Sequence, residues 1–318
     1  MPSPAIEIER LSKEYPYGFL NLKKRKSLDD LTMQVEAGEI FGFLGPNGAG
    51  KSTTIKLLMR LIFPTTGTAR ILGKPIGDVS MHRDIGYLPE QPYFYDYLTA
   101  TELLDYFARF HNLKVSDRRE RVQRLLKKVG LETAKKIQLR KYSKGMLQRV
   151  GLAQAILHDP QVVVLDEPMS GLDPLGRREV RDMILELKKQ GRTVLFSTHI
   201  LSDAEMLCDR VGVIVGGKLR GVGTPGEMVG IQSQGMEILF ELGNPERKFP
   251  LLEKATKTGE RYRVQFPEPE LYAHLDELRA ADARILSVVQ IKPTLEEFFM
   301  NLVDADLAQA NAVEVSAR

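Results

Sequence analysis

The chain has 318 residues, of which 43% are hydrophobic and 27% are charged, and its formal net charge is +3. This length predicts about two domains with a sizeable core, and the small positive charge gives no argument for nucleic acid as a partner. No run of about 18 apolar residues occurs and the start lacks an apolar signal segment, so we expect a cytoplasmic protein without a membrane-spanning helix. The lone cysteine, Cys208, excludes an internal disulfide and is interpreted as a core residue.

Residues 40–62 carry the most specific pattern. Ile40–Leu44 reads as a short buried strand, and apolar side chains recur at helical spacing after residue 54. Between them, residues 45–52 match G-x-x-x-x-G-K-[ST]: the glycines turn backbone N–H groups toward phosphates, Lys51 neutralises charge, and Ser52 can ligate Mg²⁺. We therefore predict a nucleoside triphosphate site at a helix N-terminus. It is formed by Gly45, Pro46, Asn47, Gly48, Ala49, Gly50, Lys51, Ser52 and Thr53.

Residues 4–230 alternate apolar, strand-like runs with helical patterns. This alternation predicts an α/β fold of the P-loop NTPase type, with a mainly parallel sheet flanked by helices. Val162–Leu165 and Thr193–Phe196 are further buried strand candidates. Between about 94 and 160 only helical spacing is found, which predicts a helical subdomain inserted in the sheet fold.

Two carboxylates follow the apolar run Val162–Leu165. Because the carboxyl ends of parallel strands share one edge of a sheet, Asp166 and Glu167 should lie beside the phosphate-binding loop. Asp166 suits Mg²⁺ through water or Ser52, and Glu167 could polarise the attacking water.

The region after residue 235 contains none of these nucleotide motifs. Its pattern predicts a small accessory α+β module over residues 235–303, followed by an Ala-rich tail at 304–318 that frays. The expected strands are 236–241, 261–266 and 285–291, and the expected helices are 271–279 and 295–303. An apolar stripe on the last helix is formed by Leu295, Phe298, Phe299 and Leu302.

The order of these motifs resembles that of the ATP-binding cassette (ABC) ATPases of membrane transporters, over at least residues 4–225. The resemblance implies that Ser170–Asp173 is the loop that signals between the two sites of a cassette dimer. It also implies that His199 contacts the γ-phosphate, and that Tyr15 stacks on the adenine.

Two elements depart from the pattern of that family. Residues 142–146 read Tyr-Ser-Lys-Gly-Met where the family has Leu-Ser-Gly-Gly-Gln, so that only Ser143 and Gly145 match. In the family this segment contacts ATP across a head-to-tail dimer. At the Q-loop position the alignment places Glu90, with Gln91 one residue later, and either could reach Mg²⁺ or the attacking water.

The resemblance implies an ATPase that binds ATP and Mg²⁺, forms a homodimer and drives a permease at the inner face of the cell membrane. The signature and Q-loop variants, with Pro293–Phe299, resemble the exporter branch. The alternative is a soluble ABC-type ATPase acting on nucleic acid or ribosomes; such proteins generally carry two cassettes or a long coiled coil, which this sequence lacks. The sequence identifies neither the transported substrate nor the permease.

An apparent insertion, residues 16–26, ends in the basic run Lys23–Lys26. It is interpreted as a solvated loop, with contact to anionic headgroups or a partner's cytoplasmic face as the alternative.

Overall fold

The computed structural model describes residues 3–17, 23–111, 114–229, 235–243, 248–291, 294–300 and 302–304. The chain divides into two compact units, and each is described by itself. The residues up to Pro225 form the N-terminal unit, and Gly226–Met300 form the C-terminal unit. Among the described residues, no helix has the length and apolarity that crossing a bilayer requires.

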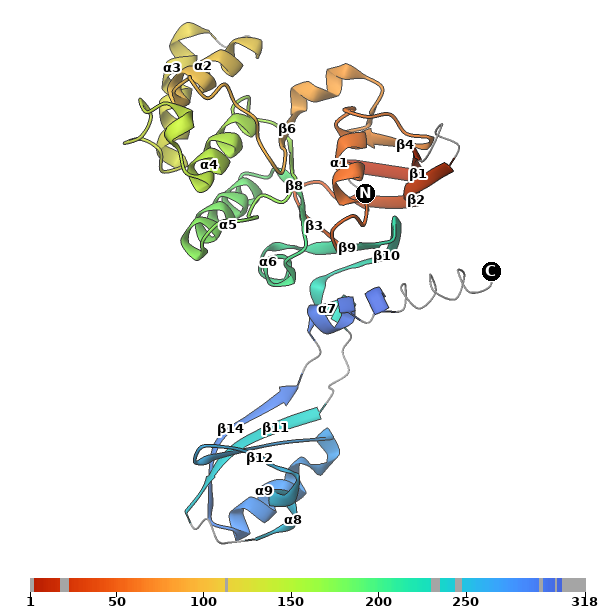
Figure 1. Cartoon of the computed structure of the whole chain (residues 1–318), viewed down its shortest axis with the longest axis vertical. Coiled ribbons are helices and arrows are strands. Elements are labelled where there is room, and N and C mark those ends of the chain that lie inside the picture. The colour runs from red at the N-terminus through yellow and green to blue at the C-terminus, as the bar shows by residue number, and fades with distance from the viewer. Residues whose placement is uncertain are drawn as a thin grey trace. The chain divides into compact units, whose positions relative to one another are not determined.

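A six-stranded sheet in the order β10-β9-β3-β8-β7-β6 forms the centre of the N-terminal unit (Figure 1). All neighbouring strands are parallel except β9 and β10, and the predicted strands at 40–44, 162–165 and 193–196 are confirmed. Because the other strands are parallel, their carboxyl ends lie along one edge. The strands are β3 (Ile40–Leu44), β6 (Ile85–Leu88), β7 (Val162–Leu165), β8 (Thr193–Thr198), β9 (Arg210–Val215) and β10 (Lys218–Gly223).

A second, antiparallel sheet in the order β2-β1-β4-β5 packs beside it. It consists of β1 (Ile6–Tyr17), β2 (Lys23–Val35), β4 (Thr66–Ile71) and β5 (Lys74–Pro75). The predicted loop at residues 16–26 is wrong at both described ends, because 15–17 pair with 23–25 in the ladder between β1 and β2. Backbone pairing does not require apolar side chains on an exposed ribbon, and Lys24 Nζ lies 3.4 Å from Glu14 Oε2 across the strands. Residues 18–22 lie outside the described residues.

Helices cover both faces of the six-stranded sheet. In Figure 1, α2, α3 and α4 gather on the opposite side of that sheet from β1, β2 and β4. Helix α2 starts at a capping box, in which Thr99 and Glu102 each bond the other's backbone N–H. The helices are α1 (Lys51–Leu58), α2 (Ala100–Phe110), α3 (Val115–Lys128), α4 (Lys144–Ala155), α5 (Pro174–Lys189) and α6 (Leu201–Leu207), with short 3₁₀ turns η2 (Val79–Asp84) and η3 (Leu139–Lys141). Helix α7 (Pro225–Val229) begins at the boundary between the two units.

Strand β7 shows how the core is divided. Val163 and Leu165 join the apolar cluster of α2–α5, whereas Val162 and Val164 join the cluster of α1 and the antiparallel sheet. All four side chains are fully buried, as expected for a strand covered on both faces. The polar residues that follow β7 are therefore positioned by a strand that is packed on both faces.

The C-terminal unit is an antiparallel sheet in the order β12-β13-β11-β14, with helices packed on one face. Its elements are β11 (Gly235–Leu242), α8 (Pro250–Lys254), β12 (Thr256–Thr258), β13 (Arg261–Phe266), η4 (Glu268–Glu270), α9 (Leu271–Ala280) and β14 (Ala283–Ile291). The predicted strands at 236–241, 261–266 and 285–291 and the helix at 271–279 are confirmed. Alternate side chains of β13 are buried and exposed, so one face is solvated.

The last predicted helix is described in two pieces, because residues 295–300 and 302–304 are helical. In the predicted apolar stripe Leu295 and Phe299 are buried, while Phe298 and Leu302 are half-buried. Residues 305–318, most of the predicted tail, lie outside the described residues.

Candidate functional site

The loop at residues 45–52 joins β3 to α1 and is held open by glycine. Gly48 and Gly50 have φ of 79° and 114°, values that glycine adopts without strain. A side chain could not fit at Gly50, because an ideal Cβ would lie 2.7 Å from the carbonyl oxygen of Ser27. No side chain caps the start of α1, so its first N–H groups remain available to bind an anion.

Lys51 is buried at the first position of α1. Its Nζ donates to the carbonyl oxygen of Gly45 at 2.6 Å and lies 3.2 Å from Glu167 Oε1. The ammonium group is therefore fixed at the mouth of the loop, where it would face the β- and γ-phosphates of a nucleotide.

Asp166, directly after β7, accepts hydrogen bonds from two hydroxyl groups. Ser197 Oγ donates to Asp166 Oδ1 at 2.6 Å, and Ser52 Oγ donates to the same oxygen at 3.1 Å. Ser197 was not predicted as a site residue. Strand pairing accounts for its position, because Leu165 lies opposite Phe196 and the next residues, Asp166 and Ser197, emerge together.

Glu167 connects the loop to His199. Its Oε2 lies 2.9 Å from His199 Nδ1, and its other oxygen faces Lys51. Its backbone has a φ of 48°, uncommon for a residue other than glycine, and its N–H donates to Ser197 Oγ at 2.9 Å. Such strained backbone persists where the surroundings hold it, and it turns two consecutive carboxylates to different partners.

Of these side chains, Lys51, Ser52, Glu167 and His199 line a cavity of about 510 Å³. Of the two Q-loop candidates, Glu90 lines the cavity and Gln91 is not among its lining residues. Ser170, the first residue of the predicted signalling loop, also lines it, and so does Ser27, which was not predicted as a site residue. Ser27 Oγ lies 2.9 Å from Thr53 Oγ1, a contact made by a distant strand that no local pattern could have indicated.

The oxygen atoms in the cavity suit Mg²⁺, a hard cation that prefers carboxylate, hydroxyl and phosphate oxygens. Ser52 Oγ and Asp166 Oδ1 already converge on each other. Among the described residues there is no cluster of three or more His, Cys, Asp or Glu that could hold a metal ion. The donor set therefore fits an ion held mainly by nucleotide phosphates and water, with one or two protein ligands.

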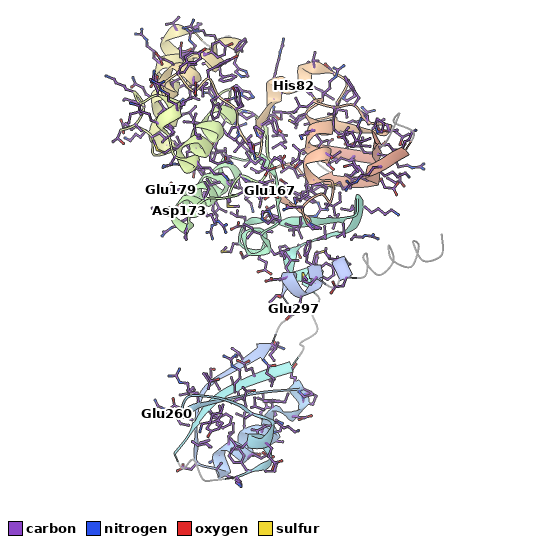
Figure 2. All side chains as sticks on the ribbon, viewed as in Figure 1. His82, Glu167, Asp173, Glu179, Glu260 and Glu297 are labelled. Atoms are coloured by element: carbon purple, nitrogen blue, oxygen red, sulfur yellow. The ribbon has the colours of Figure 1, made fainter. Side chains whose placement is uncertain are left out.

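The other predicted site residues lie elsewhere in the single chain. Ser143 is exposed at the N-cap of α4, where it accepts from the Met146 N–H, and Gly145 lies in the first turn of that helix. Asp173 is the N-cap of α5, and Figure 2 shows it with Glu179 on that helix, away from Glu167. Tyr15 lies in β1 with 38% of its surface exposed. None of these residues lines the cavity in one copy of the chain.

Burial shifts the pKa of three side chains in the N-terminal unit, those of Tyr87, Asp203 and Cys208. It raises the pKa of Tyr87 to about 12, with Asp166 adding to the effect. Burial likewise raises the pKa of Asp203, although Arg177, Arg181 and His199 act to lower it. Cys208 packs against the core, and burial raises the pKa of its thiol, which makes it a poor nucleophile.

Known proteins resemble this chain along most of its length. The family described as ABC transporter matches residues 28–170. An uncharacterized ABC transporter ATP-binding protein of Synechocystis sp. is 44% identical over 297 residues, which cover 93% of this chain and 83% of the relative. The bacitracin transport ATP-binding protein BcrA of Bacillus licheniformis is 43% identical over 198 residues, covering 61% of this chain and 64% of the relative.

A solved structure extends the likeness to the fold. The dimeric ATP-binding cassette MJ0796, in a post-hydrolysis state bound to ADP and Pi, is 25% identical with a TM-score of 0.64. The likeness covers 69% of this chain and 98% of that one.

Proposed function

Because the chain belongs to the ATP-binding proteins of ABC transporters, ATPases that act with membrane permeases, we propose that it is the motor subunit of an export system. The observation that carries this proposal is the convergence of Lys51, Glu167 and His199 on one cavity at the N-terminus of α1, where Ser52 also lines the cavity and donates to Asp166. The protein would work in the cytoplasm, on the inner face of the membrane that holds its permease.

In this proposal each side chain has a distinct task in hydrolysis. The glycine loop and Lys51 bind the phosphates, and His199 holds the carboxylate of Glu167 toward the γ-phosphate. Glu167 then accepts a proton from the attacking water, for which its ion pair with Lys51 must open. Bound Mg²⁺, held by Ser52 and Asp166 with Glu90 at the rim, would supply charge neutralisation on the phosphates. Tyr15 would stack on the adenine.

The second copy of the chain would complete each site. Ser143 and Gly145 lie outside the cavity of their own chain, at the N-terminus of α4. In a head-to-tail dimer that helix end would face the γ-phosphate held by the partner, with Asp173 in the loop between the two sites. The dimeric state of the similar cassette MJ0796 supports this arrangement.

Two observations favour export. A relative named for bacitracin transport is 43% identical over 198 residues, and the signature and Q-loop segments resemble the exporter branch. In the alternative, a soluble ABC-type ATPase, hydrolysis would respond to nucleic acid or ribosomes. We further propose that residues 4–230 perform the nucleotide chemistry and that 235–303 form the accessory domain.

Sedimentation of Glu167→Gln with and without MgATP tests the proposed cycle. We expect separate subunits or a loose contact without nucleotide and a stable dimer with MgATP, because the variant binds ATP and hydrolyses it slowly. Affinity purification from solubilised membranes should recover the permease, and hydrolysis should rise in that complex. Stimulation by RNA or ribosomes, with no response to the membrane fraction, would favour the alternative.

A further inference from the structure

Asp203 is a buried carboxylate that the chemistry described above does not use. It lies in the first turn of α6, four residues after His199, and 3% of its surface is exposed. Its Oδ2 is buried, and among the described residues no group donates a hydrogen bond to it. A buried carboxylate oxygen without a partner costs free energy, so its presence in a folded protein calls for an explanation.

Three basic side chains act on Asp203. Arg177 and Arg181 are four residues apart on α5 and therefore lie on the same face of that helix. The Nε atom of each is buried and has no hydrogen-bond partner within the described ranges. Burial raises the pKa of Asp203, whereas the charges of Arg177, Arg181 and His199 act to lower it, in decreasing order. The carboxylate therefore lies in a cluster of charges that includes α5 on one side and His199 on the other.

This cluster lies between two helices that both begin at the nucleotide site. Helices α5 and α6 are neighbours (Figure 1), and Arg181 Nη1 donates to Met206 Sδ of α6 at 2.9 Å. Helix α5 begins after its N-cap Asp173, in the predicted signalling loop, and α6 begins two residues after His199. His199 Nδ1 in turn lies 2.9 Å from Glu167 Oε2. A charge that holds α6 on α5 therefore also fixes where His199 meets Glu167.

We propose that Asp203 is a positioning residue for His199. Together with the two arginines of α5 it holds the start of α6 in place, so that His199 stays against Glu167. Asp203 does not line the nucleotide cavity, so it acts on hydrolysis through His199 and leaves ATP binding to the phosphate-binding loop. This inference rests on the proposed function, in which His199 directs Glu167 toward the γ-phosphate.

Asp203→Asn tests the role of the charge, because it keeps the shape of the side chain. In the full-length protein the kcat of ATP hydrolysis should fall about tenfold, since a small displacement of a positioned group is enough for such a loss. The KM for ATP should change less than about twofold, because the phosphate contacts remain. Asp203→Glu keeps the charge and should recover most of the turnover. Asp182→Asn removes an exposed carboxylate of α5 and is the matched control, which should change nothing.

A His199→Ala background separates positioning from a general loss of structure. Because Asp203 acts through His199, adding Asp203→Asn should lower the residual turnover of His199→Ala by less than about twofold. A substitution that merely reduced the folded fraction would lower turnover by the same factor in both backgrounds.

NMR of the histidine side chains gives a readout that requires no turnover, and the chain has five histidines. The imidazole signal of His199 is the one that is lost in His199→Ala. This signal should shift in Asp203→Asn and stay in place in Asp182→Asn. Arg177→Gln weakens the same cluster without altering the buried carboxylate, so it should shift the same signal. This variant covers the case in which Asp203→Asn does not fold.

The proposal is overturned if the His199 signal stays in place in both Asp203→Asn and Arg177→Gln. It is also overturned if Asp203→Asn lowers turnover by the same factor with and without His199. Slow hydrolysis by His199→Ala together with native hydrolysis by Asp203→Asn would leave the proposed function intact and remove only the role of Asp203. Native hydrolysis by His199→Ala would contradict the proposed role of His199 and this inference together.

Discussion

Among the described residues, an ion pair with both side chains buried is found in the N-terminal unit and not in the C-terminal unit. In the N-terminal unit Lys51, Asp166 and Glu167 are buried together at the carboxyl edge of the parallel sheet. In the C-terminal unit the charged pairs lie on the solvated face, where Arg261 and Arg263 keep about 60% of their side chains exposed. Burying a charge costs several kcal/mol, so the first arrangement is expected only where the charges do chemistry.

The histidines repeat this contrast. His158, in the N-terminal unit, stacks on His111 with ring centroids 4.1 Å apart, and its Nδ1 is buried without a hydrogen-bond partner. His274, in the C-terminal unit, also has a buried Nδ1 without a hydrogen-bond partner, but its Nε2 lies 3.0 Å from Glu270 Oε2. The Nε2 of His158 lies instead 3.0 Å from the carbonyl oxygen of Ile85. The two histidines therefore differ in whether a carboxylate lies beside the ring, and similar substitutions in the two units can be compared directly.

The largest effect is expected at Glu167. Glu167→Gln keeps the shape of the side chain and removes the proton acceptor, so ATP hydrolysis should fall at least ~10²-fold while ATP still binds. Steady-state phosphate release, with nucleotide binding measured separately, checks this. The matched control is Glu241→Gln, which changes a half-buried carboxylate of the C-terminal unit and should leave hydrolysis unchanged. Native turnover by Glu167→Gln would show that another group acts as the base.

The next effect is expected at Lys51. Lys51→Ala removes the buried ammonium group that faces the phosphates, so ATP affinity itself should weaken by about tenfold or more. Titration with a fluorescent ATP analogue measures this without relying on turnover. Lys257→Ala, on β12, removes an exposed lysine from the other unit and should not alter affinity. Unchanged affinity in Lys51→Ala would contradict the assignment of residues 45–52 as the phosphate-binding loop.

Local patterns predicted the parts of the site that are continuous in sequence. The loop at 45–52 and the carboxylates after β7 each follow from residues within one short window. Ser27 and Ser197 were missed as site residues, although Ser27 lines the cavity and Ser197 donates to Asp166. Their roles depend on which strands become neighbours, and contacts 26 to 31 residues apart leave no local trace.

The same limit explains the error in the fold. The pairing of residues 15–17 with 23–25 extends a hairpin through charged residues that, read alone, are typical of a loop. Hydrophobic alternation marks a strand only where one face is buried, and residues 15–16 and 24–26 of this ribbon are exposed. In the C-terminal unit, by contrast, every β13 side chain follows the alternation, and that strand was predicted at its observed bounds.

A smaller effect is expected at His158. Burial, with His111 and Arg121 adding to it, lowers the pKa of His158 to about 4, although a backbone bond to Ile85 and the charge of Asp84 act to raise it. A histidine in the unfolded chain titrates near 6.5. Between about pH 6.5 and 4, His158 is therefore protonated in the unfolded state and neutral in the folded state. The free energy of unfolding falls as the pH falls through this range.

His158→Gln should remove part of that loss. Urea unfolding at pH 7 and pH 5 should show a decrease in the free energy of unfolding that is about 1 kcal/mol smaller in the variant than in the native chain, after allowance for solvent screening. His274→Gln removes a histidine from the other unit without touching the stack and serves as the control. An identical pH dependence of the free energy of unfolding in the native chain and in His158→Gln would mean that protonation of His158 does not contribute to the loss of stability in acid.

The smallest effect is expected at the pair of Glu237, which is half-buried, and Arg263, which is exposed. Arg263 Nε lies 3.6 Å from Glu237 Oε1, a long contact for an ion pair, and solvent screens most of the arginine. Glu237 also accepts from Gln265 Nε2 at 2.8 Å, so removing the arginine leaves the carboxylate with a partner. A double-mutant cycle of Glu237→Gln and Arg263→Gln should give a coupling below about 0.5 kcal/mol, decreasing further in salt.

The same cycle on Lys51 and Glu167 should give a coupling several times larger that salt barely changes, because both groups are buried. Equal coupling energies in the two cycles would show that burial does not determine how strongly these two ion pairs interact.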